Sequence, residues 1–367
     1  MKRVLLALSL ILLLLLAYLL AWPVAVDPVA WDAPEDKGYV GDFAPNEKLA
    51  NLELLDIGKT YGPEDVTSRE IEGEMFLFVP THDGKVQKID PKSGAIETIA
   101  NTGGVPLGTE FDAEGNLIIA DAYKGLVSVA MDGTVTVLTD TVDGTPILYA
   151  DDLDIAENGV IYFSDASTKF GAEWAGSTMQ GSLYEIMEHG RTGRILTYDP
   201  ATQKTSVVME NLSFANGVAM GPKDSSIYVN ETGEYRVLRH WIKGPKKGET
   251  DVLMDNLPGF PDNINRGPGN SYYVGLVSKR SKVLDDMSAK PFTRKVIWRL
   301  PEFMKPAAEN YGFIIQMRAD GHIMRTWQDP SGAYPSTTGA HLAEDGHLYI
   351  TSLTATKLGR LNQNKKQ

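Results

Sequence analysis

The chain of 367 residues contains no cysteine, which excludes disulfides, thiolate metal sites and a cysteine nucleophile. Basic residues are also scarce, since 35 Lys and Arg stand against 48 Asp and Glu for a net charge of -13. Because binding to nucleic-acid phosphates requires concentrated Lys and Arg, this balance argues against a nucleic-acid partner. The motifs G-x-S-x-G and H-E-x-x-H are absent as well. The sequence therefore indicates neither a serine-esterase nucleophile elbow nor a zinc-peptidase helix.

The N-terminal segment is a long hydrophobic run. Lys2 and Arg3 are followed by VLLALSLILLLLLAYLLAWPVAV, an uncharged stretch that matches the ~20 apolar residues needed to span a bilayer as a helix. A cleaved signal peptide also begins with basic residues, but its apolar region is usually only about 7–15 residues long. We therefore expect residues 1–26 to be an uncleaved transmembrane anchor, with a cleaved signal segment as the alternative. The basic flank should stay cytoplasmic, which places everything after Asp27 in a periplasmic, lumenal or extracellular space.

Residues 27–50 are expected to be a stalk, and a short pattern recurs from about residue 60 onward. Each unit alternates V/I/Y/F strands with Asp-Gly or Asn-Gly turns, as in DDLDIAENGVIYFSDAS, which is typical of β-hairpins. Repetition at roughly 45 residues with about four strands per unit predicts a propeller. Six units can be counted, so we expect residues 51–367 to form one all-β, six-bladed β-propeller. Its ring should close by pairing a strand near Leu52–Ile57 with the last blade.

Two insertions interrupt the repeat. The first, residues 169–194, has a possible short helix at Ser182–His189, and the second, residues 279–306, has helical stretches around Val283–Ser288 and Lys295–Met304. Long connections in a compact domain tend to form functional lids or rims. Their aromatic and Met content would suit an apolar pocket wall or a membrane-facing surface, and simple packing over a propeller edge is the alternative.

Acidic and amide residues occur at matching points of the repeat. The pattern predicts four of them just before the innermost strand of a blade: Glu64, Asp151, Asn216 and Asp262. Around a common axis their side chains would converge, and a ring of carboxylate and amide oxygens suits a hard cation such as Ca²⁺. Most other aspartates are expected to cap turns or strand ends instead: Asp83, Asp132, Asp143, Asp320 and Asp345 in turns, and Asp121 and Asp165 at strand ends.

Several of these strings resemble one known family. YADDLDIAENGVIYFSDAS, SFANGVAM, VNETGEYRVLRHWIKGPKKGE and LPGFPDNI resemble the strictosidine synthase-like and adipocyte plasma membrane-associated protein-like family, over essentially all of residues 60–360. More distantly the chain is similar to the gluconolactonase and paraoxonase superfamily of six-bladed propellers. The resemblance implies a catalytic Ca²⁺ on the axis, held by Glu64, Asp151, Asn216 and Asp262. Where the family usually has Asn, this chain has Asp151, and the added charge should tighten binding of a divalent cation.

The superfamily resemblance also implies a possible second ion. Paraoxonases pair each liganding residue with a neighbour, and this chain has Asp65, Asp152 and Asn263 at the adjacent positions. The carboxylates of Asp65 and Asp152 could then hold a second, structural calcium.

The chemistry implied is hydrolysis of small, fairly apolar esters or lactones. A bound Ca²⁺ with open positions would polarise the substrate carbonyl and stabilise the developing oxyanion. Asp262 could serve as general base or nucleophile, although a metal-bound carboxylate is a weak base. His341 is the alternative, because it lies just before the first strand of the last blade and could point into the central mouth. His82 and His347 are expected to be exposed at turns, and His240 should face a blade surface.

Two other functions stay open. A strictosidine synthase-type condensation needs a glutamate near position 339, which is glycine here, and Glu344 is the only acid before the following Asp-Gly turn. The missing acid argues against that reaction. The other alternative is a non-catalytic binding or scaffold propeller in which calcium only stiffens the channel. Removing calcium should abolish turnover in an enzyme and only lower the melting temperature in a scaffold.

Overall fold

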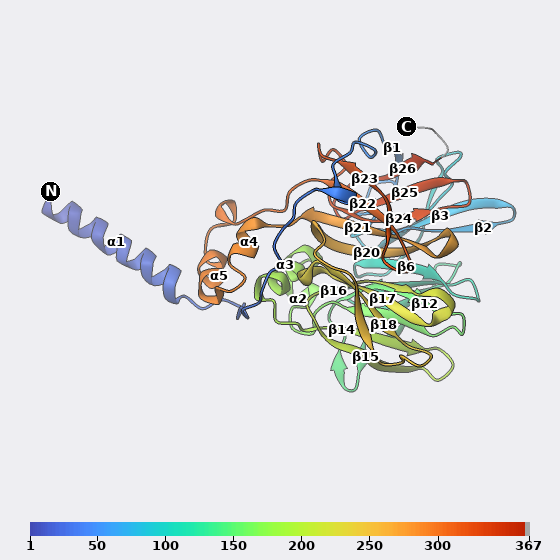
Figure 1. Cartoon of the computed structure of the whole chain (residues 1–367), viewed down its shortest axis with the longest axis horizontal. Coiled ribbons are helices and arrows are strands. Elements are labelled where there is room, and N and C mark those ends of the chain that lie inside the picture. The colour runs from blue at the N-terminus through green and yellow to red at the C-terminus, as the bar shows by residue number, and fades with distance from the viewer. Residues whose placement is uncertain (364–367) are drawn as a thin grey trace.

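The recurring strand-and-turn pattern folds into six four-stranded antiparallel sheets around one axis in the computed structural model, which describes residues 1–363 (Figure 1). The prediction of an all-β, six-bladed propeller with helical insertions and an N-terminal apolar helix is confirmed. Blade 1 consists of β2 (Thr67–Ile71), β3 (Glu74–Pro80), β4 (Lys85–Ile89) and β5 (Ile96–Asn101). Blade 2 consists of β6 (Pro106–Phe111), β7 (Leu117–Asp121), β8 (Gly125–Val129) and β9 (Val135–Thr139). Blade 3 consists of β12 (Ala150–Ile155), β13 (Ile161–Asp165), β14 (Gly193–Asp199) and β15 (Lys204–Leu212).

The other three blades repeat this order, and the first strand of each blade, or β24 in blade 6, lies innermost. Blade 4 consists of β16 (Ala215–Met220), β17 (Ser226–Glu231), β18 (Arg236–Trp241) and β19 (Thr250–Met254). Blade 5 consists of β20 (Gly259–Gly267), β21 (Ser271–Lys279), β22 (Gly312–Arg318) and β23 (Ile323–Asp329). Blade 6 consists of β24 (Thr337–Leu342), β25 (His347–Ser352), β26 (Lys357–Asn362) and β1 (Glu53–Asp56). A small extra hairpin pairs β10 (Thr141–Val142) with β11 (Thr145–Pro146).

The ring is closed by a strand from the start of the domain. β1 pairs antiparallel with β26, in the register that puts Glu53 opposite Arg360. The side chains of these two residues also form an ion pair. Closure by a strand near Leu52–Ile57 is thereby confirmed, and it removes the open sheet edge that an unclosed propeller would expose.

Both insertions are helical and lie at the same end of the propeller. The first carries α2 (Ala172–Ala175) and α3 (Thr178–Glu188), and the second carries α4 (Lys282–Asp286), α5 (Pro291–Trp298) and the 3₁₀ turn η5 (Glu302–Met304). We call these five elements the helical cover. The α3 helix starts four residues before the predicted Ser182 because the Ser177 hydroxyl accepts the Gln180 N–H. The predicted stretch Lys295–Met304 is instead split, since Pro301 cannot continue a helix.

The N-terminal helix α1 (Lys2–Ala21) projects from that same end, so the helical cover lies between it and the blades (Figure 1). It is long and apolar enough to cross a membrane, by length and composition. The segment expected as a stalk lies against the protein: Val26 and Trp31 are buried, and the backbone N–H groups of Val29 and Trp31 donate to the carbonyls of Glu188 and Ser288. The remaining 3₁₀ turns are η1 (Gly41–Phe43), η2 (Pro222–Asp224), η3 (Thr232–Glu234) and η4 (Pro268–Asn270).

Candidate metal centre

Three of the four predicted ligands sit at irregularities of the innermost strands. The strand pairing slips between Ala150 and Leu153 in β12, between Ala215 and Val218 in β16, and between Pro261 and Ile264 in β20. The ligands Asp151, Asn216 and Asp262 therefore lie inside these strands, and the expectation that they precede them is wrong. Such bulges bend a strand and re-aim its side chains, which here turns all three toward the axis. Glu64 alone precedes its strand, β2.

A glycine lets two of these bulges approach each other. A Cβ atom on Gly217 would lie 2.5 Å from the Asp262 carbonyl oxygen and 2.6 Å from the Ile264 nitrogen. Real Cβ atoms do not make such contacts, so only glycine fits between the inner strands of blades 4 and 5. The dipeptide Asn216-Gly217 is thus an amide ligand followed by the residue that allows its neighbour blade to come close.

The structure brings the predicted ligands together. Oxygens of Glu64, Asp151 and Asp262 can lie within 4.8 Å of one another, and all three side chains are buried. Within residues 1–363, these three acids are the group whose possible ligand atoms lie close enough together to hold one metal ion. Together with Asn216 these residues form the floor of a cavity of about 390 Å³.

Burial, joined by repulsion at Glu64 and Asp151, raises the pKa values of the acids in this cluster. Burial, and then the charges of Asp262 and Asp151, raise the pKa of Glu64 well above its usual range. Burial and the Asp262 charge do the same to the pKa of Asp151. Burial raises the pKa of Asp262 to about 7, against a hydrogen bond with Asn216 that lowers it. Like charges packed together in a low-dielectric site strongly favour a bound cation.

Several oxygens at the site also lack a partner. Among the described residues, Glu64 Oε2, Asn216 Oδ1 and Asn263 Oδ1 are buried with no hydrogen-bond partner. Buried acceptors are nearly always satisfied in proteins, so orphaned oxygens require an explanation. The other Glu64 oxygen is held 3.0 Å from the Asn263 amide nitrogen, which leaves Oε2 free to face the axis. Carboxylate and amide oxygens arranged in this way fit a hard cation such as Ca²⁺.

The neighbouring acids Asp65 and Asp152 each form a hydrogen bond to the adjacent blade. Asp65 Oδ2 accepts the Thr109 N–H at 2.9 Å, and Asp152 Oδ2 accepts the Val218 N–H at 2.9 Å. In each case the carboxylate on one blade bonds the backbone of the next blade. The structure therefore gives Asp65 and Asp152 a role in holding adjacent blades together, and a second calcium there stays a prediction.

His341 is not brought to the cluster. Its Nε2 lies 2.7 Å from the Ser68 hydroxyl oxygen, between the last and first blades, and it does not line the cavity. Thr338, three residues earlier on β24, donates to the Glu64 carbonyl, so at ~3.3 Å per residue His341 lies about 10 Å further along the channel. Burial lowers the pKa of His341 to about 4, which keeps the ring neutral.

Of the other polar residues, two aspartates have the strand-end role that the sequence predicted, and one histidine is less exposed than expected. Asp121 Oδ1 accepts the N–H groups of Val105 and Tyr123, and Asp165 accepts that of Tyr149, as expected for strand-end residues. His82, expected to be exposed, is instead largely covered and its burial lowers its pKa to about 4.

An aromatic wall of the cavity was not anticipated from the sequence. Tyr149, Phe214 and Phe260 line the cavity, and each lies two residues before a predicted ligand. The Tyr149 hydroxyl donates to the Thr178 carbonyl of α3, which ties this wall to the helical cover. The repeated pattern of an aromatic residue, any residue and then an oxygen ligand was present in the sequence and could have identified the wall.

The fold is a six-bladed propeller whose axis carries a buried acidic and amide cluster that could hold a metal ion, and comparison with known proteins specifies the family. The family model for strictosidine synthase matches residues 151–245, and that for the N-terminal part of strictosidine synthase-like proteins matches residues 41–89. The chain is 34% identical to adipocyte plasma membrane-associated protein of Salmo salar, over 96% of this chain and 87% of the relative. It is 31% identical to the Homo sapiens protein of that name (92% and 84% covered) and 30% identical to strictosidine synthase-like 6 of Arabidopsis thaliana (88% and 86% covered). The chain belongs to the strictosidine synthase-like family.

Solved structures of similar fold are more distant in sequence. A gluconolactonase from Xanthomonas campestris superposes with a TM-score of 0.59 at 14% identity, covering 92% of this chain and 98% of the other. Regucalcin from Agrobacterium tumefaciens, described as a calcium-binding protein, gives a TM-score of 0.55 at 13% identity, covering 85% and 90%. At these identities the likeness establishes the six-bladed fold.

Proposed function

We propose that the protein is a calcium-dependent hydrolase of small esters or lactones, anchored in a membrane by α1 with its propeller outside the cytoplasm. The observation that carries the proposal is the cluster of Glu64, Asp151 and Asp262 beside Asn216, with unpartnered oxygens at the floor of a largely apolar cavity. A purely structural ion could be enclosed by protein, whereas this one would face a space large enough for a small substrate.

The residues present suit the hydrolytic step. The bound ion would supply Lewis-acid polarisation of a carbonyl oxygen. Tyr149, Phe214 and Phe260 would hold the apolar part of the substrate against the cavity floor. Asp262 would accept the proton of the attacking water as the water oxygen bonds to the carbonyl carbon. The bond to the leaving oxygen then breaks, and that oxygen takes the proton, which gives an acid and an alcohol, or a hydroxy acid from a lactone.

A strictosidine synthase-type condensation finds no acid at its expected place. A Cβ on Gly339 would lie 2.5 Å from Asn265 Oδ1, so a carboxylate side chain there would have to displace the Asn265 side chain. The scaffold alternative is supported by one observation: Glu64 is bonded by Asn263 and Thr338, which links the first blade to the fifth and sixth. An ion at this point would also stiffen the ring.

The test is hydrolysis of phenyl acetate and a panel of small lactones by the full-length protein, with calcium and again with EGTA. We expect calcium-dependent turnover that is lost, together with calcium binding, in Asp262→Ala and Asn216→Ala. The matched control is Asp121→Asn, which should keep turnover, because this buried aspartate lies away from the cavity and accepts only backbone N–H groups, those of Val105, Tyr123 and Lys124. Activity retained by metal-free Asp262→Ala would contradict the mechanism. A calcium-raised melting temperature without turnover on any ester would favour the scaffold.

A further inference from the structure

The end of α1 is fixed to the helical cover by one arginine. Arg299, which follows α5, donates from Nε to the Trp22 carbonyl at 2.6 Å and from Nη1 to the Leu19 carbonyl at 2.9 Å. These carbonyls belong to the last turn of the apolar helix and its first following residue, where intrahelical partners run out. If α1 spans a bilayer, these bonds hold α5 at the level where the helix leaves the hydrocarbon.

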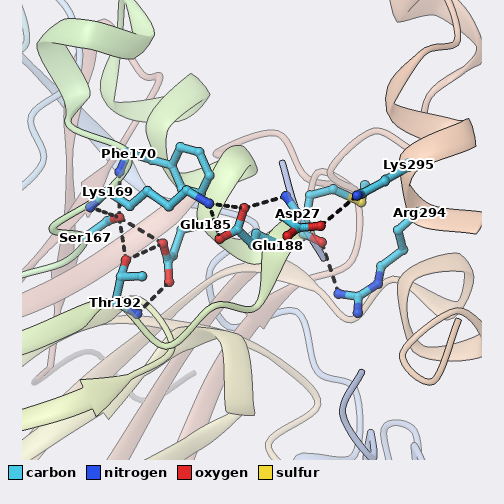
Figure 2. Close-up of polar contacts among 10 residues, drawn as sticks. Asp27, Ser167, Lys169, Phe170, Glu185, Glu188, Thr192, Arg294 and Lys295 are labelled. Carbon is cyan, nitrogen blue, oxygen red and sulfur yellow. Dashed lines mark hydrogen bonds and ion pairs between the residues drawn. The ribbon is translucent and has the colours of Figure 1, made fainter. Parts of the chain in front are cut away.

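A second set of contacts makes the helical cover one unit with the chain that follows α1. Arg294 of α5 is fully buried and donates to the carbonyls of Val29, Met187 and Ser288, which lie on three different segments. Figure 2 shows Asp27 between the two insertions: its N–H donates to Glu188 at 2.6 Å and its carboxylate pairs with Lys295 at 2.6 Å. The cover is therefore tied to the segment that follows α1.

The cover carries large apolar side chains that no part of the described protein covers. Phe303 is 87% exposed, Trp174 63%, Phe292 57% and Met304 55%. A chain of ring contacts runs from Trp174 through Tyr184 to Trp298, so the two insertions share this surface. Exposed aromatic and Met side chains gathered in one region mark an interaction surface. Trp22 is exposed as well, and Trp residues at a span's end belong to the membrane interface.

The inner side of the same elements faces the metal centre. Leu183 and Met187 of α3, Leu284 of α4, Met287 and Trp298 line the cavity that has the acidic cluster at its floor. The cover thus has one apolar side toward the cavity and another toward the end of α1. We infer that the helical cover is seated in the surface of the bilayer that α1 crosses, and that the cavity receives its ligand from the lipid phase. Resting on the proposed hydrolase function, this makes the substrate class a membrane-dissolved ester or lactone.

The absence of cysteine gives a direct test in the full-length protein, because one introduced cysteine is a unique labelling site. Phe292→Cys and Phe303→Cys would each carry an environment-sensitive NBD fluorophore, in protein reconstituted into phosphatidylcholine vesicles. The matched controls are Val137→Cys and Val252→Cys, exposed apolar positions on outer strands β9 and β19. Thermal unfolding of each labelled variant checks that it is folded.

We expect NBD at positions 292 and 303 to be blue-shifted and quenched by doxyl-labelled lipid, and NBD at 137 and 252 to be quenched only by aqueous iodide. Equal behaviour at all four positions would overturn the seating of the cover. Protection that rises with the protein-to-lipid ratio and is insensitive to doxyl-lipid would show that a second copy covers the patch, which also overturns it. This measurement needs no turnover, so it stands or falls separately from the hydrolase proposal.

The substrate class has its own readout. Phe292→Ser combined with Phe303→Ser should reduce turnover of a long-chain ester dissolved in the vesicles several-fold. Hydrolysis of a short water-soluble ester by the same protein should be unchanged, because neither residue lines the cavity. An equal loss on both esters, or no loss on either, would refute delivery from the lipid.

Discussion

Replacing Asp151 by Asn should change stability in opposite directions with and without calcium. The substitution keeps the shape of the side chain and removes one of three buried charges whose oxygens approach within 4.8 Å. At an effective dielectric constant of ~20, two unit charges at this distance repel by about 3 kcal/mol. Because burial and Asp262 raise the pKa of Asp151, the carboxyl group avoids part of that repulsion by staying protonated. We therefore expect the calcium-free Asn variant to gain about 1–3 kcal/mol in the free energy of unfolding.

With calcium the sign reverses. A ring with one carboxylate fewer binds a divalent cation more weakly. A ligand that binds only the folded state stabilises it by RT ln(1 + [L]/Kd), so each tenfold rise in Kd removes about 1.4 kcal/mol of the calcium-dependent stabilisation. The Asn variant should thus be more stable than the natural protein in EGTA and should gain less on addition of calcium.

The assay is thermal unfolding of both full-length proteins across a calcium titration, at one scan rate. Asp121→Asn is the matched control, since Asp121 is a buried aspartate away from the cluster and its Oδ1 accepts the N–H groups of Val105 and Tyr123. Losing those bonds should lower stability equally with and without calcium. If Asp151→Asn destabilised the calcium-free protein, or left the calcium increment unchanged, the repulsive cluster would not be the metal centre.

Two further predictions concern His341 and the anchor. Burial lowers the pKa of His341 to about 4 from its usual 6.5, so the unfolded chain binds more protons between these values and stability is lost as pH falls through that window. His341→Gln should therefore lessen the acid-induced fall of the melting temperature and retain turnover at pH 7. Loss of turnover in the folded variant would give the histidine a catalytic role. The basic residues Lys2 and Arg3 should lie in the cytoplasm, so protease added to the non-cytoplasmic face of the membrane should digest the propeller. Digestion from the cytoplasmic face alone would reverse the proposed topology.

The fold was predictable because its signals are local. Asp-Gly turns and strands of alternating polarity mark hairpins wherever they occur, and the closing strand β1 continues that pattern at the other end of the domain. The observed helix boundaries in the insertions differ from the predicted ones for equally local reasons. Ser177 caps the start of α3, and Pro301 separates α5 from η5. Both residues were visible in the sequence.

The candidate site was predictable in composition and only partly in placement. The bulges that hold Asp151, Asn216 and Asp262 are register shifts between strands, which a pattern of apolar and polar residues in one strand does not record. The role of Asp152 depends on an N–H group 66 residues away in the next blade. His341 was expected just before the first strand of the last blade, but it lies near the far end of β24. Thr338, at the start of that strand, is the residue that contacts Glu64.

The helices that wall the cavity and the N-terminal helix α1 share their supporting contacts, and this has a consequence for both. Arg294 is buried to the point that its pKa falls to about 10, and its guanidinium depends on carbonyls from the segment after α1 and from both insertions. A chain beginning after residue 27 would lose the Asp27 bonds to Glu188 and Lys295 together with the carbonyls that Arg299 binds. Buried cations left without partners are costly, so the helices that wall the cavity would lose support although no cavity residue had changed. Properties of the site are therefore properties of the full chain, anchor included.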